Sequence, residues 1–402
     1  MEGSVTSNIL LYVLLLVTLA AGWWLGRRSR RSGLAPGRNK SGSSPSRDYF
    51  IGLNYLLNDE PDDAIDIFIQ SLEINSSTLE THMALGTLLR RRGKVDRSIT
   101  VYQDLLGQSG FSADELNEIK INLVQSYISA GLLDRAEHLL EELRTAKTSI
   151  KRKALVQSAH VYQLEKDWQD GVDVLMELLK VCDPAKRVEY QHLASHFYCE
   201  LAEIELDNQH MSQAREYLQQ AVNLDKGNVR VSILRGKLEQ LCGNYSEAIR
   251  YYLQVKKQDP VFMADVFFPL IDSYRKAGKE KALHKFIESC MEQENNATVL
   301  LGLADYLEQE KGKAAASDFL MQRLEHKSSL RLLLQALVMK ADLEETSSHE
   351  LEACRRVLGD YIDSKAQYCC DNCGFELKSL HWHCPSCLRW GSVKHVMGIL
   401  GE

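Results

Sequence analysis

Two pairs of cysteines near the end of the chain have the spacing of metal-binding turns. Cys370 and Cys373 are separated by two residues, ten residues follow, and Cys384 and Cys387 repeat the spacing. Two intervening residues let both thiolates of a pair reach one ion, and a second such turn completes a tetrahedral shell of four sulfurs. Gly374 lets the backbone fold back after the first pair. The spacing therefore predicts one zinc or iron ion in a site of four cysteine thiolates.

Other potential ligands lie nearby, and we expect them to remain outside the metal shell. Cys369 would give a three-residue spacing, which fits the turn less well, and four thiolates already suffice without His381, His383 or His395. The segment 363–402, which we call the metal module, is too small at about 40 residues for a core of its own. The ion should therefore supply much of its folding free energy. The ligand type leaves zinc and iron both open.

The rest of the chain shows no constellation of residues that predicts catalysis. Among its 402 residues there is no G-x-S-x-G, no phosphate-binding glycine loop and no H-E-x-x-H. The net charge of -7 provides no basic field for duplex nucleic acid. The ten cysteines do not have the pattern of a secreted disulfide framework. We therefore expect a protein that is not an enzyme, with two or three structural units.

The segment 1–31 is typical of a membrane anchor with a basic flank. An uncharged apolar run from Ile9 to Leu25, just long enough to cross a bilayer, is followed by Arg27, Arg28, Arg30 and Arg31. Because cations stay on the cytoplasmic side, we expect a single pass with the bulk of the chain in the cytoplasm. A cleaved signal peptide would carry its charge before the apolar run, and a buried core helix is the other alternative. Residues 32–47, rich in Ser and Gly, should form a flexible tether.

A 34-residue period organises residues 48–362. Gly52 and Gly86 are 34 apart, as are Ala214 and Ala248, and large residues such as Tyr102 recur at a fixed distance behind the small ones. This is the tetratricopeptide pattern of stacked helical hairpins, with about eight repeats. Small residues let the two helices of a hairpin approach, and we expect the large ones to fill the gap to the next hairpin. Intervals of 38 (Ser98 to Ala136) and 43 (Gly171 to Ala214) predict longer loops or helices there.

Such an array forms a superhelix whose concave face holds an extended peptide or another protein. Candidate residues of this groove lie on the first helices of the early repeats: Glu80, Arg90, Arg91, Glu118, Gln125 and Ser129. For Arg90 to Arg92 the simpler interpretation is that cations before Gly93 complement a helix C-terminus. Met263, Phe267 and Phe268 are expected in the core. The predicted fold class is all-α, a tetratricopeptide superhelix with an N-terminal transmembrane helix and a small C-terminal metal domain.

The metal module resembles the rubredoxins. "CDNCGF" and "HCPSC" are similar to the two metal-binding knuckles of those proteins, which hold a redox iron. Leu388 stands where rubredoxins commonly have Gly after the second pair, which argues against iron redox chemistry. A rubredoxin-type iron protein is nevertheless one alternative function. A zinc-ribbon protein that binds nucleic acid through Arg389, Trp390 and Lys394 is another.

The order of anchor, repeats and metal module resembles the lipopolysaccharide assembly protein B family of Gram-negative inner membranes. The matching stretches are "GRR" at Gly26, "RDYFIGLNYLL" from Arg47, "GLLDRAE" from Gly131, "HFYCELA" from His196, "RVSILRG" from Arg230 and "CGFELKSLHWHCPSC" from Cys373. The resemblance implies an inner-membrane adaptor that presents the committed-step deacetylase of lipid A synthesis to the membrane-bound AAA+ protease FtsH for degradation. It also implies restraint by a sulfatase-like inner-membrane protein. Neither the residues nor the resemblance decides whether the chain forms a homo-oligomer.

Overall fold

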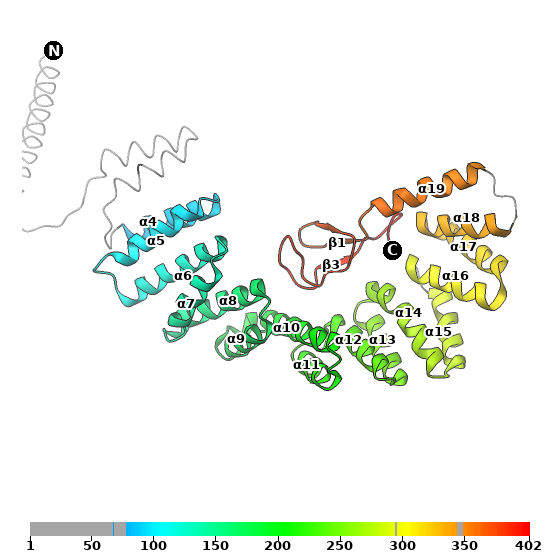
Figure 1. The fold of residues 1–402 in the computed structure, drawn as a ribbon, viewed down its shortest axis with the longest axis horizontal. Coiled ribbons are helices and arrows are strands. Elements are labelled where there is room, and N and C mark those ends of the chain that lie inside the picture. The colour runs from blue at the N-terminus through cyan, green and yellow to red at the C-terminus, as the bar shows by residue number, and fades with distance from the viewer. Residues whose placement is uncertain (1–66, 68–77, 294–295, 344–348) are drawn as a thin grey trace, which may run out of the picture. The chain divides into compact units, whose positions relative to one another are not determined.

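Paired helices make up most of the described chain, which comprises residues 67, 78–293, 296–343 and 349–402 of the computed structural model (Figure 1). The first helices of the pairs are α4 (Leu79–Arg91), α6 (Ala113–Ser129), α8 (Thr148–Glu165), α10 (Arg187–Asp207), α12 (Val229–Leu241), α14 (Met263–Lys276), α16 (Ala297–Lys311) and α18 (Leu330–Leu343). The second helices are α5 (Val95–Gly107), α7 (Leu133–Leu143), α9 (Trp168–Val181), α11 (Met211–Leu224), α13 (Tyr245–Gln258), α15 (Glu280–Gln293), α17 (Lys313–His326) and α19 (His349–Ser364). Two short 3-10 turns, η1 (Pro184–Lys186) and η2 (Pro260–Phe262), precede α10 and α14.

The predicted anchor (1–31), the tether (32–47) and the first predicted repeat around Gly52 lie outside the described residues. Within the ranges that are described, none of the helices is at once long and apolar enough to cross a bilayer. The anchor therefore stays a prediction from the sequence.

Close approach of the paired helices depends on the small residues of the repeat. A Cβ added to Gly236 in α12 would lie 2.2 Å from Tyr252 Cε1, and one added to Gly86 in α4 would lie 2.6 Å from Tyr102 Cζ. Both tyrosines belong to the second helix of the same pair, so the rings fill space within their own hairpin, a contact that our expectation did not include. Tyr252 also belongs to a buried cluster with residues of the next pair. The ring can lie directly over the glycine because no side chain occupies that position on the first helix.

The longer repeat intervals are accounted for by longer first helices. α6 has 17 residues and α10 has 21, whereas α4 and α12 have 13 each. The structure also adds a final pair, α18 and α19, that the repeat comparison did not identify. The sequence does contain the repeat pattern here, because the buried Ala336 lies one 34-residue period after Gly302.

The buried apolar residues of the described helices form several clusters along the array. Met263 and Phe267 are fully buried as predicted, but Phe268 is 50% exposed, so its assignment to the core is wrong. Successive helix residues point about 100° apart, and α14 turns only one of the two phenylalanines inward.

The metal module differs from the array because it contains a small sheet. Strands β1 (Tyr368–Cys370), β2 (Glu376–Leu377) and β3 (Val393–His395) pair antiparallel in the order β2-β1-β3, with Cys369 between Glu376 and Lys394. The fold is therefore mostly helical, of the tetratricopeptide type, with a small C-terminal metal-binding domain. The class all-α describes the array alone.

Candidate metal centre and its contacts with the repeats

The structure brings four thiols together at the tips of two turns. The sulfurs of Cys370, Cys373, Cys384 and Cys387 all lie within 4.8 Å of one another. The Cys370–Cys387 and Cys373–Cys384 Sγ distances are both 3.7 Å. Metal–sulfur bonds of about 2.3 Å in a tetrahedron require sulfurs about 3.8 Å apart. The donor set and its spacing thus fit one zinc or iron ion held by four cysteines.

The two turns have the same backbone geometry even though their residues differ. Gly374 N–H donates to Cys370 O at 2.8 Å, and Leu388 N–H donates to Cys384 O at 2.9 Å. Gly374 has φ +73° and Leu388 has φ +57°. Leu388 thus adopts the left-handed conformation of the glycine it replaces, at a cost of about 1–2 kcal/mol. Leu388 therefore keeps the hydrogen bond of the turn and does not disfavour iron, contrary to the expectation from the sequence.

The environment of the thiols is uneven. Burial opposes ionisation of Cys370, but the Ser392 hydroxyl and the backbone N–H groups of Cys373 and Asn372 outweigh it and lower its pKa to about 6. Burial raises the pKa of Cys384 to about 11. Several hydrogen-bonding groups therefore stabilise the Cys370 thiolate, whereas the Cys384 thiol needs a cation beside it to ionise.

The neighbouring potential ligands all lie outside the four-thiol cluster. His381 Nε2 lies 3.2 Å from the Ser379 hydroxyl, and Cys369 Sγ lies 3.9 Å from the backbone carbonyl oxygen of Cys370. His383 Nε2 lies 3.0 Å from Leu388 O. His395 Nε2 lies 2.9 Å from Asp265 Oδ2 in α14. The four cysteines therefore form the cluster without them.

Trp390, just after the second cysteine pair, is buried against the repeats. Its indole N–H donates to Gln163 Oε1 of α8 at 2.9 Å. Its ring stacks on His196 of α10, with centroids 5.1 Å apart, and contacts Trp168 of α9 edge-on at 5.9 Å. Aromatic contacts of this kind contribute about 0.5–1.5 kcal/mol beyond their buried area. Trp390 therefore anchors the metal module in the middle of the array.

Arg230, at the start of α12, lies beneath both tryptophans of the metal module. Its side chain is 2% exposed, and its Nη2 contacts Glu200 at 2.8 Å and Glu203 at 2.6 Å. The guanidinium carbon lies 5.7 Å from the Trp382 ring centroid and 5.8 Å from that of Trp390. A desolvated cation over aromatic faces is strongly attracted to them.

Further contacts extend the interface toward the end of the array. Trp382 stacks on Phe262 of η2 with centroids 5.1 Å apart, and Lys394 pairs with Asp259 at 3.0 Å. The buried Glu402 carboxylate accepts from Thr298 N–H at 2.8 Å and pairs with Arg331 at 2.6 Å. Trp390 and Lys394, which suggested a nucleic-acid surface, are thus engaged within the chain. We call Gln163, His196, Arg230, Phe262 and Asp265 the docking face of the array.

The groove candidates of the early repeats form a different arrangement. Arg90 Nη2 donates to Gln125 Oε1 at 2.8 Å, and Lys153 of α8 pairs with Glu118 of α6. These bonds link successive first helices, about one repeat apart. Ser129 donates to Gln125 O, and Arg91 is exposed in the last turn of α4. The predicted residues therefore lie along one line of first helices, but several are engaged with each other.

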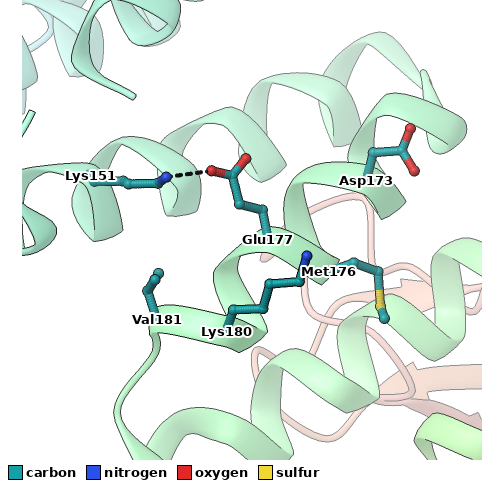
Figure 2. A pocket seen from close by; sticks show the side chains of 6 residues that line it. All are labelled: Lys151, Asp173, Met176, Glu177, Lys180 and Val181. Carbon is teal, nitrogen blue, oxygen red and sulfur yellow. Dashed lines mark ion pairs between the residues drawn. The ribbon is translucent and has the colours of Figure 1, made fainter. Parts of the chain in front are cut away.

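A separate hollow lies between α8 and α9 of the third described pair. Figure 2 shows its lining side chains, Lys151 of α8 and Asp173, Met176, Glu177, Lys180 and Val181 at α9. Lys151 and Glu177 form an ion pair at 2.7 Å, and Arg144 also contacts Glu177 at 2.6 Å. The hollow contains none of the predicted site residues.

Both the repeat array and the metal module resemble known protein families. Residues 368–395 match the model described as rubredoxin metal binding domain, and residues 195–228 match the tetratricopeptide repeat. The chain is 33% identical to lipopolysaccharide assembly protein B of Escherichia coli K12, over 98% of this chain and 99% of that protein. It is 31% identical to the protein of the same name in Haemophilus influenzae, over 96% of this chain and 98% of that one.

Among solved structures, the crystal structure of MamA protein matches with a TM-score of 0.35 and 18% identity, covering 47% of this chain and 96% of that one. The full-length relatives carry more weight, because their similarity includes both the repeats and the metal module. The chain belongs to the lipopolysaccharide assembly protein B family.

Proposed function

We propose that this chain is an inner-membrane adaptor that limits lipopolysaccharide synthesis. In this proposal it brings the committed-step deacetylase of lipid A synthesis to the membrane-bound AAA+ protease FtsH, and a sulfatase-like membrane protein restrains it. The observation that carries the proposal is the 33% identity, over 98% of the chain, to a protein named for lipopolysaccharide assembly. The adaptor mechanism itself comes from the family resemblance.

The architecture is suited to binding proteins rather than to transforming a substrate. Stacked helical hairpins present a long surface that binds other proteins. The metal site is a four-thiol cluster, which leaves no open coordination position for a substrate when one ion is bound tetrahedrally. We therefore assign Cys370, Cys373, Cys384 and Cys387 to a structural metal site and propose no catalytic residue.

Residues 1–31 provide the proposed location. The uncharged run from Ile9 to Leu25, followed by four arginines, would hold the chain in the inner membrane, with residues 48–402 in the cytoplasm. This places the array beside a membrane-bound protease and within reach of a cytoplasmic enzyme. The tether, residues 32–47, would let the array move laterally around its anchor.

The test is the half-life of the deacetylase in the bacterium that carries this chain. We expect deletion of the gene to lengthen the half-life, and the full chain to restore rapid turnover only while FtsH is active. A chain lacking residues 1–31 should fail to restore it, whereas one with an unrelated single-pass anchor and the same basic flank should succeed. An unchanged half-life after deletion of the gene would contradict the adaptor function. Full activity without any anchor would contradict its membrane location.

A further inference from the structure

We infer that the repeat array tunes how tightly the metal module holds its ion, and that Gln163 and Arg230 are positioning residues of the metal site. Neither residue is in the four-thiol cluster. Two tryptophans bracket the second cysteine pair: Trp382 lies two residues before Cys384, and Trp390 lies three residues after Cys387. Arg230 contacts both tryptophans, and Gln163 contacts Trp390. The inference rests on this geometry and does not depend on the proposed function.

Backbone hydrogen bonds tie the two tryptophans to each other and to the second turn. Gly391 N–H donates to Trp382 O at 2.7 Å, and His383 forms a bridge with Trp390. Cys384 N–H donates to Arg389 O at 3.0 Å, which closes the turn directly before Trp390. A displacement of either tryptophan would therefore move the backbone that carries Cys384 and the sulfur it presents.

The metal module has little apolar core with which to hold this turn on its own. Its own buried cluster consists of Cys370, Cys384 and Val393, and two of these are metal-binding cysteines. Trp390 instead belongs to the core cluster of α8, α9 and α10, where it packs with Trp168 and Phe197. The array thus supplies the apolar packing that a domain of this size lacks.

The Arg230 guanidinium packs against both Trp382 and Trp390. Its Nε and Nη1 atoms are buried and have no hydrogen-bond partner within the described ranges, and its guanidinium carbon lies 5.7 and 5.8 Å from the centroids of the two indole rings. Glu200 and Glu203 hold its Nη2 in place. Arg230 therefore fixes Trp382 and Trp390 together. Gln163 fixes the indole nitrogen of Trp390 through its Oε1, and its Nε2 lies 3.0 Å from His383 Nε2, directly before Cys384.

Residues that orient metal ligands from outside the shell typically change metal affinity by about 10- to 100-fold. Linkage makes the effect reciprocal: contacts that position the second turn tighten metal binding, and the bound metal strengthens the contact with the array by the same factor. Loss of the ion would accordingly uncover His196, Arg230 and Phe262. The state of the metal would then change the surface that the array offers to a partner.

The test is a zinc competition titration of the full chain in detergent against a chromophoric chelator. We expect Gln163→Leu and Arg230→Ala each to release zinc at about 10-fold lower chelator concentration than the wild type. The matched control is Arg275→Ala, which breaks a bond between Arg275 and Gln309 on α14 and α16, away from the docking face, and should leave the titration unchanged.

Cobalt substitution supplies a spectroscopic readout that a loss of general stability would not change. The variants should keep the visible absorption of tetrahedral cobalt thiolate when saturated, because all four cysteines remain. Circular dichroism checks that the helices are intact. If Arg230→Ala fails to fold, Gln163→Leu decides, since it removes the amide that contacts Trp390 and His383 and keeps the side-chain volume. Wild-type zinc affinity in a folded Gln163→Leu chain would overturn the inference, whatever the outcome for deacetylase turnover.

Discussion

The early repeats and the docking face use the same helical hairpins to create opposite surfaces. Across α4, α6 and α8, polar side chains such as Arg90 and Gln125 bridge successive first helices and stay in contact with water. Across α8, α10 and α12, Gln163, His196 and Arg230 are instead buried beside the two tryptophans of the metal module. One part of the described array thus binds the metal module of its own chain, while the early repeats keep polar side chains in contact with water.

Removing one metal-binding cysteine should have the largest effect, because it should disrupt the metal module on the docking face and leave the early repeats unchanged. Cys384→Ser leaves three thiolates, so the ion is lost and the metal module unfolds, because metal binding supplies its folding free energy. Metal analysis and limited proteolysis should show loss of bound metal and rapid cleavage within residues 363–402, with the helices of the early repeats intact. The control is Cys369→Ser, which lies outside the four-thiol cluster. Retention of metal and of deacetylase turnover by Cys384→Ser would contradict the assignment of this ligand.

Two arginine substitutions compare the two surfaces directly. Arg230→Ala should cost about 3–5 kcal/mol, because it leaves Glu200 and Glu203 without the buried cation they pair with. Arg90→Ala removes a partly exposed bond to Gln125 and should cost about 0–1 kcal/mol. Chemical unfolding followed by circular dichroism measures both. Equal costs would show that the docking face is no more important to stability than the early repeats.

Close helix approach within a pair should be sensitive to a single methyl group. Gly236→Ala puts a Cβ 2.2 Å from the Tyr252 ring and should cost about 1–3 kcal/mol. Gly359→Ala in α19 meets nothing within 4 Å and should stabilise the helix by about 0.5–1 kcal/mol. The midpoint of urea unfolding tests the pair. A neutral Gly236→Ala would mean that Tyr252 moves freely, contrary to its packing here.

Acid should weaken the docking face through His196. Burial, together with the nearby His192, Arg230 and His383, holds the pKa of His196 well below its usual value. The unfolded chain, with an ordinary histidine pKa near ~6.5, then binds a proton that the folded chain does not. Stability present above that pH is therefore lost as the pH falls below it, by about 1 kcal/mol from pH 6.5 to 5.5. His196→Phe keeps an aromatic ring over Trp390 and should lose less stability over this interval.

Comparing wild type and His196→Phe removes the contribution of the metal thiolates, which also bind protons on acidification and are common to both chains. The measurement is the unfolding free energy at the two pH values with zinc in excess. Identical losses in the two proteins would show that His196 does not titrate as its burial implies.

Short-range sequence patterns predicted the metal site and the helical repeats. The contact between the metal module and the array depends on packing between residues far apart in the sequence. The two cysteine turns are formed by neighbouring residues, so their spacing was enough to bring four thiols together. The 34-residue period likewise predicted the helix pairs, since small residues such as Gly86 and Gly236 pack against a ring of their own hairpin. The repeat class of the array and the metal site of the module could therefore be predicted from the sequence.

The docking face could not be predicted in the same way, because Gln163 and Trp390 are 227 residues apart. One signal was nevertheless available. Trp382 and Trp390 bracket a cysteine pair in a domain too small to bury them itself, which indicates that another surface must cover them. Which helices cover the tryptophans depends on how the hairpins stack. The same stacking decides that Phe267 is buried while Phe268 is half exposed.

Hydrogen exchange of the full chain, with and without its metal, tests the contrast between the two regions most directly. We predict that removing the ion speeds exchange in the metal module, in the middle of α10 and at the start of α12, while α4 and α6 are unchanged. Exchange that increases in the metal module alone, with α10 and α12 as protected as before, would contradict the coupling between the metal site and the array.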